Sequence, residues 1–223
     1  LEKFLFDNLD DYEKAKIIFE SINTKVWVNQ WVSTGFSELS NSFNESKNFK
    51  IVIHGKNWNL CSNSVHFIDW FHSLNKRNEI QLSEINLKNL VLKSKRNGFY
   101  ETFGKLVFKC KENQLTLDCD YDKKSDNKLL ISIFCELKVI ECEFSGNQLK
   151  GTIQHKNTTE NFLMNVSYLS ERTSNLIESI FKKNKCSLPT YDQSVVHHKL
   201  IFQTLKNHFD KSNIKTSNLL PIT

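Results

Sequence analysis

The sequence predicts an α+β protein: a short β–α–β unit, then a large, mostly antiparallel open sheet with helices packed on one face. Three observations predict this class. The first 32 residues place one helical repeat between two apolar stretches. Residues 80–162 carry successive runs of β-branched and aromatic side chains separated by turn residues. Two amphipathic helical patterns then close the chain.

The β–α–β unit comes first. Residues 1–6 and 25–29 each predict a short strand, and residues 12–22 predict a helix that Asp10 or Asp11 caps. Strand, helix and strand in this order form the crossover of a parallel sheet, which needs cover on both faces. Two strands are too few for such a sheet, so the unit is interpreted as the last part of a larger one.

This interpretation divides the chain in two. Residues 1–32 are expected to be the C-terminal remnant of one domain, and residues 33–223 a second domain of α+β type. A helix near residues 35–43, a strand at 49–54 and a helix ending at Leu74 open the second domain.

The predicted sheet follows, with turns at residues 111–113, 122–127 and 145–147. Its strands are expected at residues 99–110, 114–121, 129–136, 139–144 and 149–155. A helix over residues 170–183 comes next, and Thr190 is expected to cap the last one.

Composition narrows the function classes. The 223 residues include 30 basic and 25 acidic side chains, a net charge of +5, spread too evenly to favour a nucleic-acid partner. No segment is long and apolar enough to predict a membrane span, and no signal peptide is seen. The six cysteines form no CxxC pair, which fits a reducing cytoplasm.

Three stretches, taken in order, resemble the glucose–fructose oxidoreductase / inositol dehydrogenase family (Gfo/Idh/MocA type). Glu2-Lys3-Phe4 is similar to the family's Glu-Lys-Pro motif. Residues 55–69 are similar to the segment that leads into a helix with a catalytic histidine. Residues 186–194, followed by His197 and a helix, resemble its C-terminal signature, especially in members associated with surface-polysaccharide synthesis. The resemblance covers essentially the whole chain.

The resemblance implies a fold and a reaction. It makes residues 1–32 the end of a Rossmann domain and residues 33–223 the substrate-binding and oligomerisation domain. The reaction is hydride transfer between NAD or NADP and a sugar, sugar nucleotide or cyclitol. Among the six glycines there is no GxGxxG, so the chain alone is expected to bind no cofactor tightly and to be inactive. A homo-oligomer through the open sheet face is the expected assembly.

The resemblance also assigns catalytic residues. Lys3 matches the lysine that contacts the substrate hydroxyl and nicotinamide, and Glu2 precedes it in the cofactor motif. An ammonium there stabilises developing alkoxide charge. His66 matches the general acid/base, a role that suits an imidazole. The family often has an acid four residues earlier, where this chain has Ser62, and Asn63 is the polar substitute one turn before His66.

Further substrate-binding candidates surround these two. Asp69 either orients the His66 imidazole or is a surface carboxylate. Trp58 and Asn57 are an aromatic and an amide of the kind that sugar sites use, although Trp58 suits a core position equally well. Trp31 and His197 complete the set. His54, His197 and His198 suggest no metal site, because spacing indicates no third ligand.

Two further function classes remain open. The same fold can serve a non-catalytic oligomerisation or binding protein, which the missing glycine loop and Ser62 favour. A nucleic-acid-binding domain is the third, but no motif of that class is present.

Overall fold

An eight-stranded sheet organises the chain, which the computed structural model describes at residues 1, 4–43, 45–125, 127–214, 216 and 219–222. The strands are β1 (Phe49–Lys56), β2 (Gln81–Lys93), β3 (Tyr100–Cys110), β4 (Asn113–Asp120), β5 (Lys128–Cys135), β6 (Lys138–Ser145), β7 (Gln148–His155) and β8 (Thr159–Asn165). Their order across the sheet is β2-β3-β4-β1-β5-β6-β7-β8. The six strands predicted for this sheet by residue range are confirmed to within two residues.

Strand β1 lies at the centre of this sheet. It pairs in parallel with β4 and antiparallel with β5, and every other neighbouring pair is antiparallel. Phe49, Ile51 and Ile53 point from β1 into the core, with more exposed residues between them. The expectation of a mostly antiparallel open sheet is therefore confirmed, with one parallel pair at its middle.

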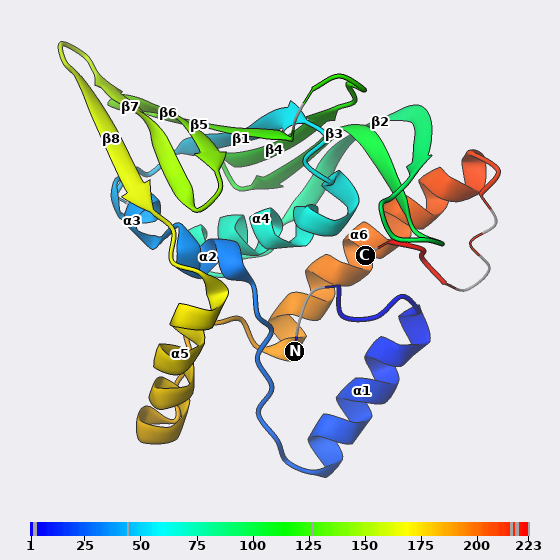
Figure 1. The fold of residues 1–223 in the computed structure, drawn as a ribbon. Coiled ribbons are helices and arrows are strands. Elements are labelled where there is room, and N and C mark those ends of the chain that lie inside the picture. The colour runs from blue at the N-terminus through cyan, green and yellow to red at the C-terminus, as the bar shows by residue number, and fades with distance from the viewer. Residues whose placement is uncertain (2–3, 44, 126, 215, 217–218, 223) are drawn as a thin grey trace.

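The helices gather on one face of the sheet (Figure 1). They are α1 (Leu9–Ser21), α2 (Trp31–Gly35), α3 (Ser37–Asn41), α4 (Leu60–Leu74), α5 (Leu169–Lys183) and α6 (Tyr191–Lys211). Helix α4 lies directly on β3 and β4, and α6 contacts α4 in turn. The predicted helix over residues 35–43 is thus two short ones, α2 and α3.

Helix α4 is buried along nearly its whole length. Every residue from Leu60 to His72 except Asn63 is buried, because the helix has the sheet on one side and α2 and α6 on the other. Trp70 and Phe71 are fully inaccessible at its centre. A helix covered all round carries its polar side chains into the interior as well, and those side chains form the candidate sites.

The N-terminal unit differs from the prediction. Asn8, not Asp10 or Asp11, caps α1: its side-chain oxygen accepts a hydrogen bond from the Asp10 N–H at 3.0 Å. Because the cap precedes them, the two aspartates lie in the first turn of α1, where carboxylates favour the helix dipole.

The two strands predicted beside α1 are wrong as strands within the described residues. The segments still meet in a parallel pattern, since the Leu1 amine donates to Trp27 O at 3.0 Å and the Asn29 N–H to Leu1 O at 2.7 Å. Other backbone groups here pair singly with the C-terminal half, in bridges from Asn8 to Leu219 and from Trp27 to Thr190. One such pair is too short a ladder to count as a strand. The division at residue 32 stays a prediction.

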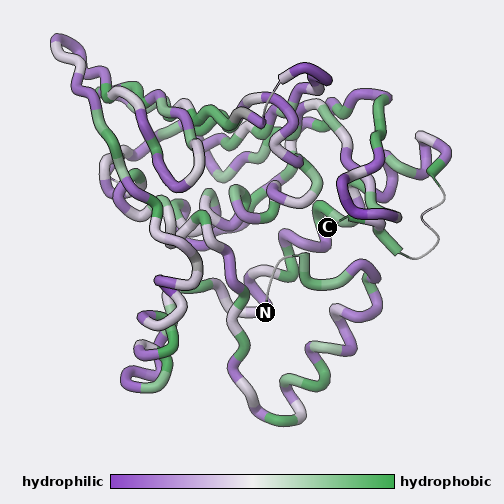
Figure 2. Tube along the Cα trace, in the orientation of Figure 1, coloured by the Kyte–Doolittle hydropathy of each residue, from purple (hydrophilic) through white to green (hydrophobic). Residues whose placement is uncertain are grey.

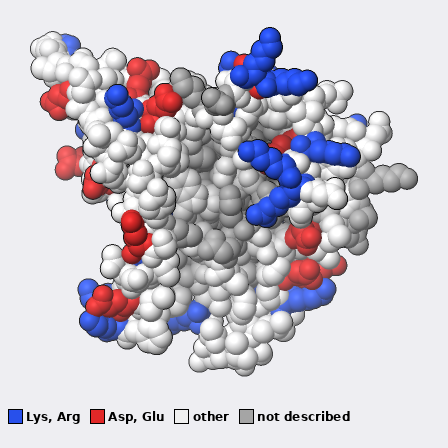
Figure 3. All heavy atoms as spheres, in the orientation of Figure 1, with Lys and Arg blue, Asp and Glu red and all other residues white. Residues whose placement is uncertain are grey.

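The surface bears both apolar and charged regions. Helix α5 leaves the apolar side chains of Ile177 and Phe181 exposed, the latter at 85%. Figure 2 shows that α5 contains both hydrophobic and hydrophilic positions. Acidic and basic side chains are interspersed over the face drawn in Figure 3. Of the helices in the described part of the chain, none is long and apolar enough to cross a membrane.

Candidate active site

His66 lies in the second turn of α4 and is 1% exposed. The chain leaves β1 and enters this helix through two left-handed residues, Asn57 (φ 53°) and Asn59 (φ 61°). Asparagine tolerates this conformation better than most residues, and Asn59 is the N-cap of α4 without a side-chain capping bond. The sharp turn fixes where α4 begins and therefore where His66 faces.

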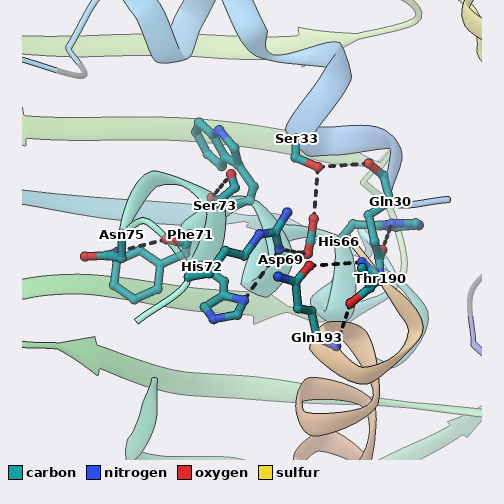
Figure 4. Close-up of polar contacts among 12 residues, drawn as sticks. Gln30, Ser33, His66, Asp69, Phe71, His72, Ser73, Asn75, Thr190 and Gln193 are labelled. Carbon is teal, nitrogen blue, oxygen red and sulfur yellow. Dashed lines mark hydrogen bonds and ion pairs between the residues drawn. The ribbon is translucent and has the colours of Figure 1, made fainter. Parts of the chain in front are cut away.

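Gln30 connects the His66 ring to a second buried histidine. Its Oε1 lies 2.6 Å from His66 Nδ1 (Figure 4). Its Nε2 lies 3.2 Å from His198 Nε2. With the amide in this orientation, His66 Nδ1 carries the hydrogen and donates to the oxygen. His66 Nε2 then keeps its lone pair, which is the tautomer that a general base needs.

His198 links this pair to the start of the chain. The Leu5 N–H lies 3.4 Å from His198 Nδ1, and the Phe4 ring centroid is 5.0 Å from that of His198. Burial lowers the pKa of His198 to about 3, so the ring is neutral. A neutral imidazole accepts at one nitrogen only, and the shorter contact from Gln30 is the stronger candidate. Glu2 and Lys3, the two predicted residues of the cofactor motif, lie outside the described residues.

Trp31 is the predicted substrate residue that the structure brings to His66. It is the first residue of α2, and its ring meets the His66 ring edge-on with centroids 5.8 Å apart. Phe36 and Phe144 pack on the same indole, and the Arg172 guanidinium donates to the Trp31 carbonyl at 2.9 Å. The Trp31 indole therefore covers His66, and its own contacts fix its position.

Asn57, Trp58 and Asn63 have their polar groups engaged in the β1–α4 turn. The Trp58 indole N–H donates to Asp118 O at 2.9 Å, and the Asn57 amide donates to Asp122 O at 2.7 Å. The Asn63 amide donates to Trp58 O at 2.7 Å. These bonds stabilise the turn, and a role of the three residues in substrate binding stays a prediction.

Asp69 does not hold the Nδ1 of His66; Gln30 does. The Asp69 carboxylate accepts from the Ser33 hydroxyl at 2.9 Å and from the Arg77 guanidinium at 2.6 Å (Figure 4). It is completely buried, so the interpretation of Asp69 as a surface carboxylate is wrong. Sequence reasoning missed Gln30, and the one available signal was an amide directly before the candidate Trp31.

A second polar cluster lies further along α4. Asp69, His72 and His197 are all buried, and each offers one ligand atom within 4.8 Å of the others. The rings of His72 and His197 are perpendicular, with centroids 4.4 Å apart. Spacing along the sequence indicates no third ligand beside His197, and the structure brings two candidate ligand residues to it from a helix more than 120 residues earlier in the chain.

The cavities described on the surface lie away from His66. One of about 600 Å³ opens over β6, β7 and β8, and one of about 420 Å³ lies between α1 and the start of α6, lined by Phe19, Val26 and Tyr191 among others. Neither borders His66.

No protein-family model matches the chain, and no curated protein matches it by sequence. Solved structures do. UDP-N-acetylglucosamine 3-dehydrogenase GnnA from Acidithiobacillus ferrooxidans matches with a TM-score of 0.66 at 8% identity, over 91% of this chain and 67% of its own. A mutant of KijD10, a 3-ketoreductase from Actinomadura kijaniata in complex with TDP-benzene and NADP, matches with a TM-score of 0.61 at 9% identity. The match covers 90% of this chain and 66% of that one.

A structure of another kind matches as well. The super-repressor mutant of Gal80p from Saccharomyces cerevisiae has a TM-score of 0.57 at 14% identity, over 94% of this chain and 70% of its own. At these identities the likeness shows the fold alone. The expected resemblance is confirmed at that level: the chain has the fold of Gfo/Idh/MocA-type oxidoreductases.

Proposed function

We propose that this chain is the substrate-binding, catalytic half of a nicotinamide-dependent oxidoreductase acting on the CH–OH group of a sugar, sugar nucleotide or cyclitol. One observation carries the proposal. Within a fold shared with dehydrogenases, the predicted acid/base His66 has its Nδ1 held by Gln30, and Gln30 contacts His198 beside Phe4 and Leu5. Phe4 and Leu5, which follow the predicted Lys3 in the sequence, are thus linked to His66 through His198 and Gln30.

The chain's own residues supply the proton chemistry in this proposal. Gln30 holds Nδ1 and leaves Nε2 to take the proton of a substrate hydroxyl and return it. The low polarity around the ring, from Trp31 and the apolar side chains of α4, strengthens the interaction of a substrate oxygen with that nitrogen.

A pyrophosphate is usually held at a glycine-rich turn into a helix, and the N-cap positions of α1 to α6 contain no glycine. We propose that NAD or NADP is held by a separate unit and that this chain alone is inactive.

A non-catalytic binding or oligomerisation protein is the second candidate. His66 is almost completely buried, and Ser62 stands where the family often has an acid. The repressor mutant among the structural neighbours supports this candidate, since it is named for a role other than catalysis. In such a protein, Gln30 and His66 are a buried hydrogen-bonded pair that stabilises the interior.

The proposal has three further parts: an assembly, a cellular location and a biological role. Phe134 and Leu163 are exposed on the sheet face opposite the core, which fits a homo-oligomer through the open sheet face. Six free cysteines, four of them buried, fit a cytoplasmic protein. A role in surface-polysaccharide synthesis rests on the sequence resemblance of residues 186–194.

The test is ligand binding by the chain as it stands. We expect UDP-N-acetylglucosamine or a member of a nucleotide-sugar and inositol panel to bind measurably in isothermal titration calorimetry. His66→Asn should weaken that binding at least tenfold, while the matched control His155→Asn, at an exposed site on β7, should leave it unchanged. NADH alone should not bind tightly. Absence of binding across the panel, together with a stable oligomer in light scattering, would favour the second candidate.

A further inference from the structure

Asp69, His72 and His197 form a donor cluster between two helices. Asp69 and His72 are one turn apart on α4, and His197 faces them from α6. The three side chains are buried, with exposures of 0%, 7% and 3%. Two imidazoles and a carboxylate are a donor set that first-row divalent metals, zinc above all, bind well.

A second observation points to a missing ligand. His197 Nδ1 is buried and has no hydrogen-bond partner among the described residues. An unsatisfied buried nitrogen costs about 1–3 kcal/mol, and most such atoms in folded proteins do have a partner. A metal ion at the cluster would supply that partner.

The surroundings of Asp69 resemble the outer shell of a metal site. The Ser33 hydroxyl donates to one carboxylate oxygen at 2.9 Å, which fixes the orientation of the group. The Arg77 guanidinium lies 2.6 Å from the other oxygen and 3.5 Å from His72 Nδ1. The Arg77 side chain is 22% exposed, so it has a path to solvent and can give up its place to an ion.

The distances suit a small ion after a modest closure. Zinc binds nitrogen at about 2.0–2.1 Å, which puts tetrahedral ligand atoms roughly 3.3 Å apart. The three donor atoms lie within 4.8 Å of one another. The donor atoms therefore have to close by at most about 1.5 Å to reach that spacing.

We propose that Asp69, His72 and His197 bind one divalent transition-metal ion, with zinc the preferred ion and Arg77 as the cation that it displaces. The fourth position of a tetrahedral ion would be open toward the side that Arg77 now occupies. The site joins α4 to α6 and is independent of whether His66 is catalytic.

The test uses the full chain, freed of metal and any purification tag, titrated with zinc and with cobalt(II). We expect one ion per chain and a cobalt spectrum of tetrahedral nitrogen–oxygen type. His197→Asn should weaken binding at least tenfold, and Ser33→Ala by about tenfold through the outer shell. His155→Asn is the matched control and should bind as the unchanged protein does.

Arg77→Met separates this proposal from a purely structural cluster. Removing the guanidinium leaves a buried carboxylate without its cation, so zinc should bind more tightly and raise the melting temperature more than in the unchanged chain. If His197→Asn does not fold, this variant still decides the question. No stoichiometric ion, thiolate bands in the cobalt spectrum, or zinc binding that Arg77→Met does not strengthen would each overturn the proposal.

Discussion

His66 and His72 lie six residues apart on the same buried helix, yet their surroundings differ. His66 meets a neutral amide and an aromatic ring, through Gln30 and Trp31. His72 meets a second imidazole, a carboxylate and a guanidinium, from His197, Asp69 and Arg77. The first arrangement fixes a tautomer, and the second gathers charge and lone pairs. Burial alone therefore does not define a histidine's role; the chemistry of its partners does.

Asp69→Ala should cause the largest loss of stability among the variants that test this comparison. The substitution leaves the Arg77 guanidinium without its carboxylate, and the Ser33 hydroxyl keeps only the Gln30 carbonyl, 3.1 Å away, as an acceptor. Breaking a buried pair typically costs about 3–5 kcal/mol, and the partial exposure of Arg77 puts the expected loss at about 3 kcal/mol. Urea denaturation measures it, with Glu160→Ala on the exposed edge strand as the control that should leave the midpoint unchanged. A loss equal to the control's would show that the charged cluster contributes nothing.

Gln30→Leu should have the next largest effect. It removes the partner of His66 Nδ1 and of His198 Nε2 at once, and an unsatisfied buried group costs about 1–3 kcal/mol. We expect a loss of about 2–3 kcal/mol, together with a change in the His66 tautomer visible in the nitrogen shifts of its ring. The exposed Gln154→Leu serves as control. An unchanged tautomer would contradict the role given to Gln30.

Acidic pH should lower the stability of the protein through the buried histidines of both clusters, around His66 and around His72. The pKa values of His72, His197 and His198 are lowered by burial, so the unfolded chain binds more protons than the folded one and stability rises with pH. The stability is intact above about pH 6.5 and falls as the pH drops below that value. For His198, with a pKa of about 3, the loss at pH 5 is about 2 kcal/mol. Melting curves between about pH 7.5 and 5 measure the slope, which His198→Gln should reduce; a flat profile would contradict these directions.

Thr190→Ala should cause the smallest loss of stability and should affect the His66 and His72 clusters equally. Thr190 caps α6, which carries His197 and His198, and its hydroxyl accepts from the Gln193 N–H while the Gln193 side chain accepts from the Thr190 N–H. Loss of the cap should cost about 1 kcal/mol, against no change for the exposed Ser174→Ala on α5. If the free energy of zinc binding changed by more than this loss of stability, or if the His66 tautomer changed, the cap would be acting on one site selectively.

The sheet was predictable because its signal is local. In β5, for example, Ile131 and Ile133 alternate with more exposed neighbours, and turns such as Gly146-Asn147 separate strands of similar length. Residues 1–6 and 25–29 carry a similar local pattern, but a strand also needs neighbours to pair with. In the described residues, Leu1 bonds to Trp27 and Asn29, and Trp27 forms one isolated bridge to Thr190, which is too little for a strand.

The candidate site was predictable only in part, because its contacts are not local. His66 was identified by resemblance and Trp31 by its place after an apolar stretch, and the two do meet. Gln30 and the pairing of His197 with His72 depend on how α6 and the α2 region pack on α4. No spacing within the sequence carries that information.

The central position of β1 has a consequence for how the protein is made. Residues 49–56 leave the ribosome long before residues 113–120 and 128–135, the two strands that flank them. During that interval Ile51 and Ile53 belong to a strand with two open edges, a form that pairs readily with other chains. Productive folding should therefore wait until about residue 135 has been synthesised, and nascent chains stalled before that point should be the aggregation-prone ones.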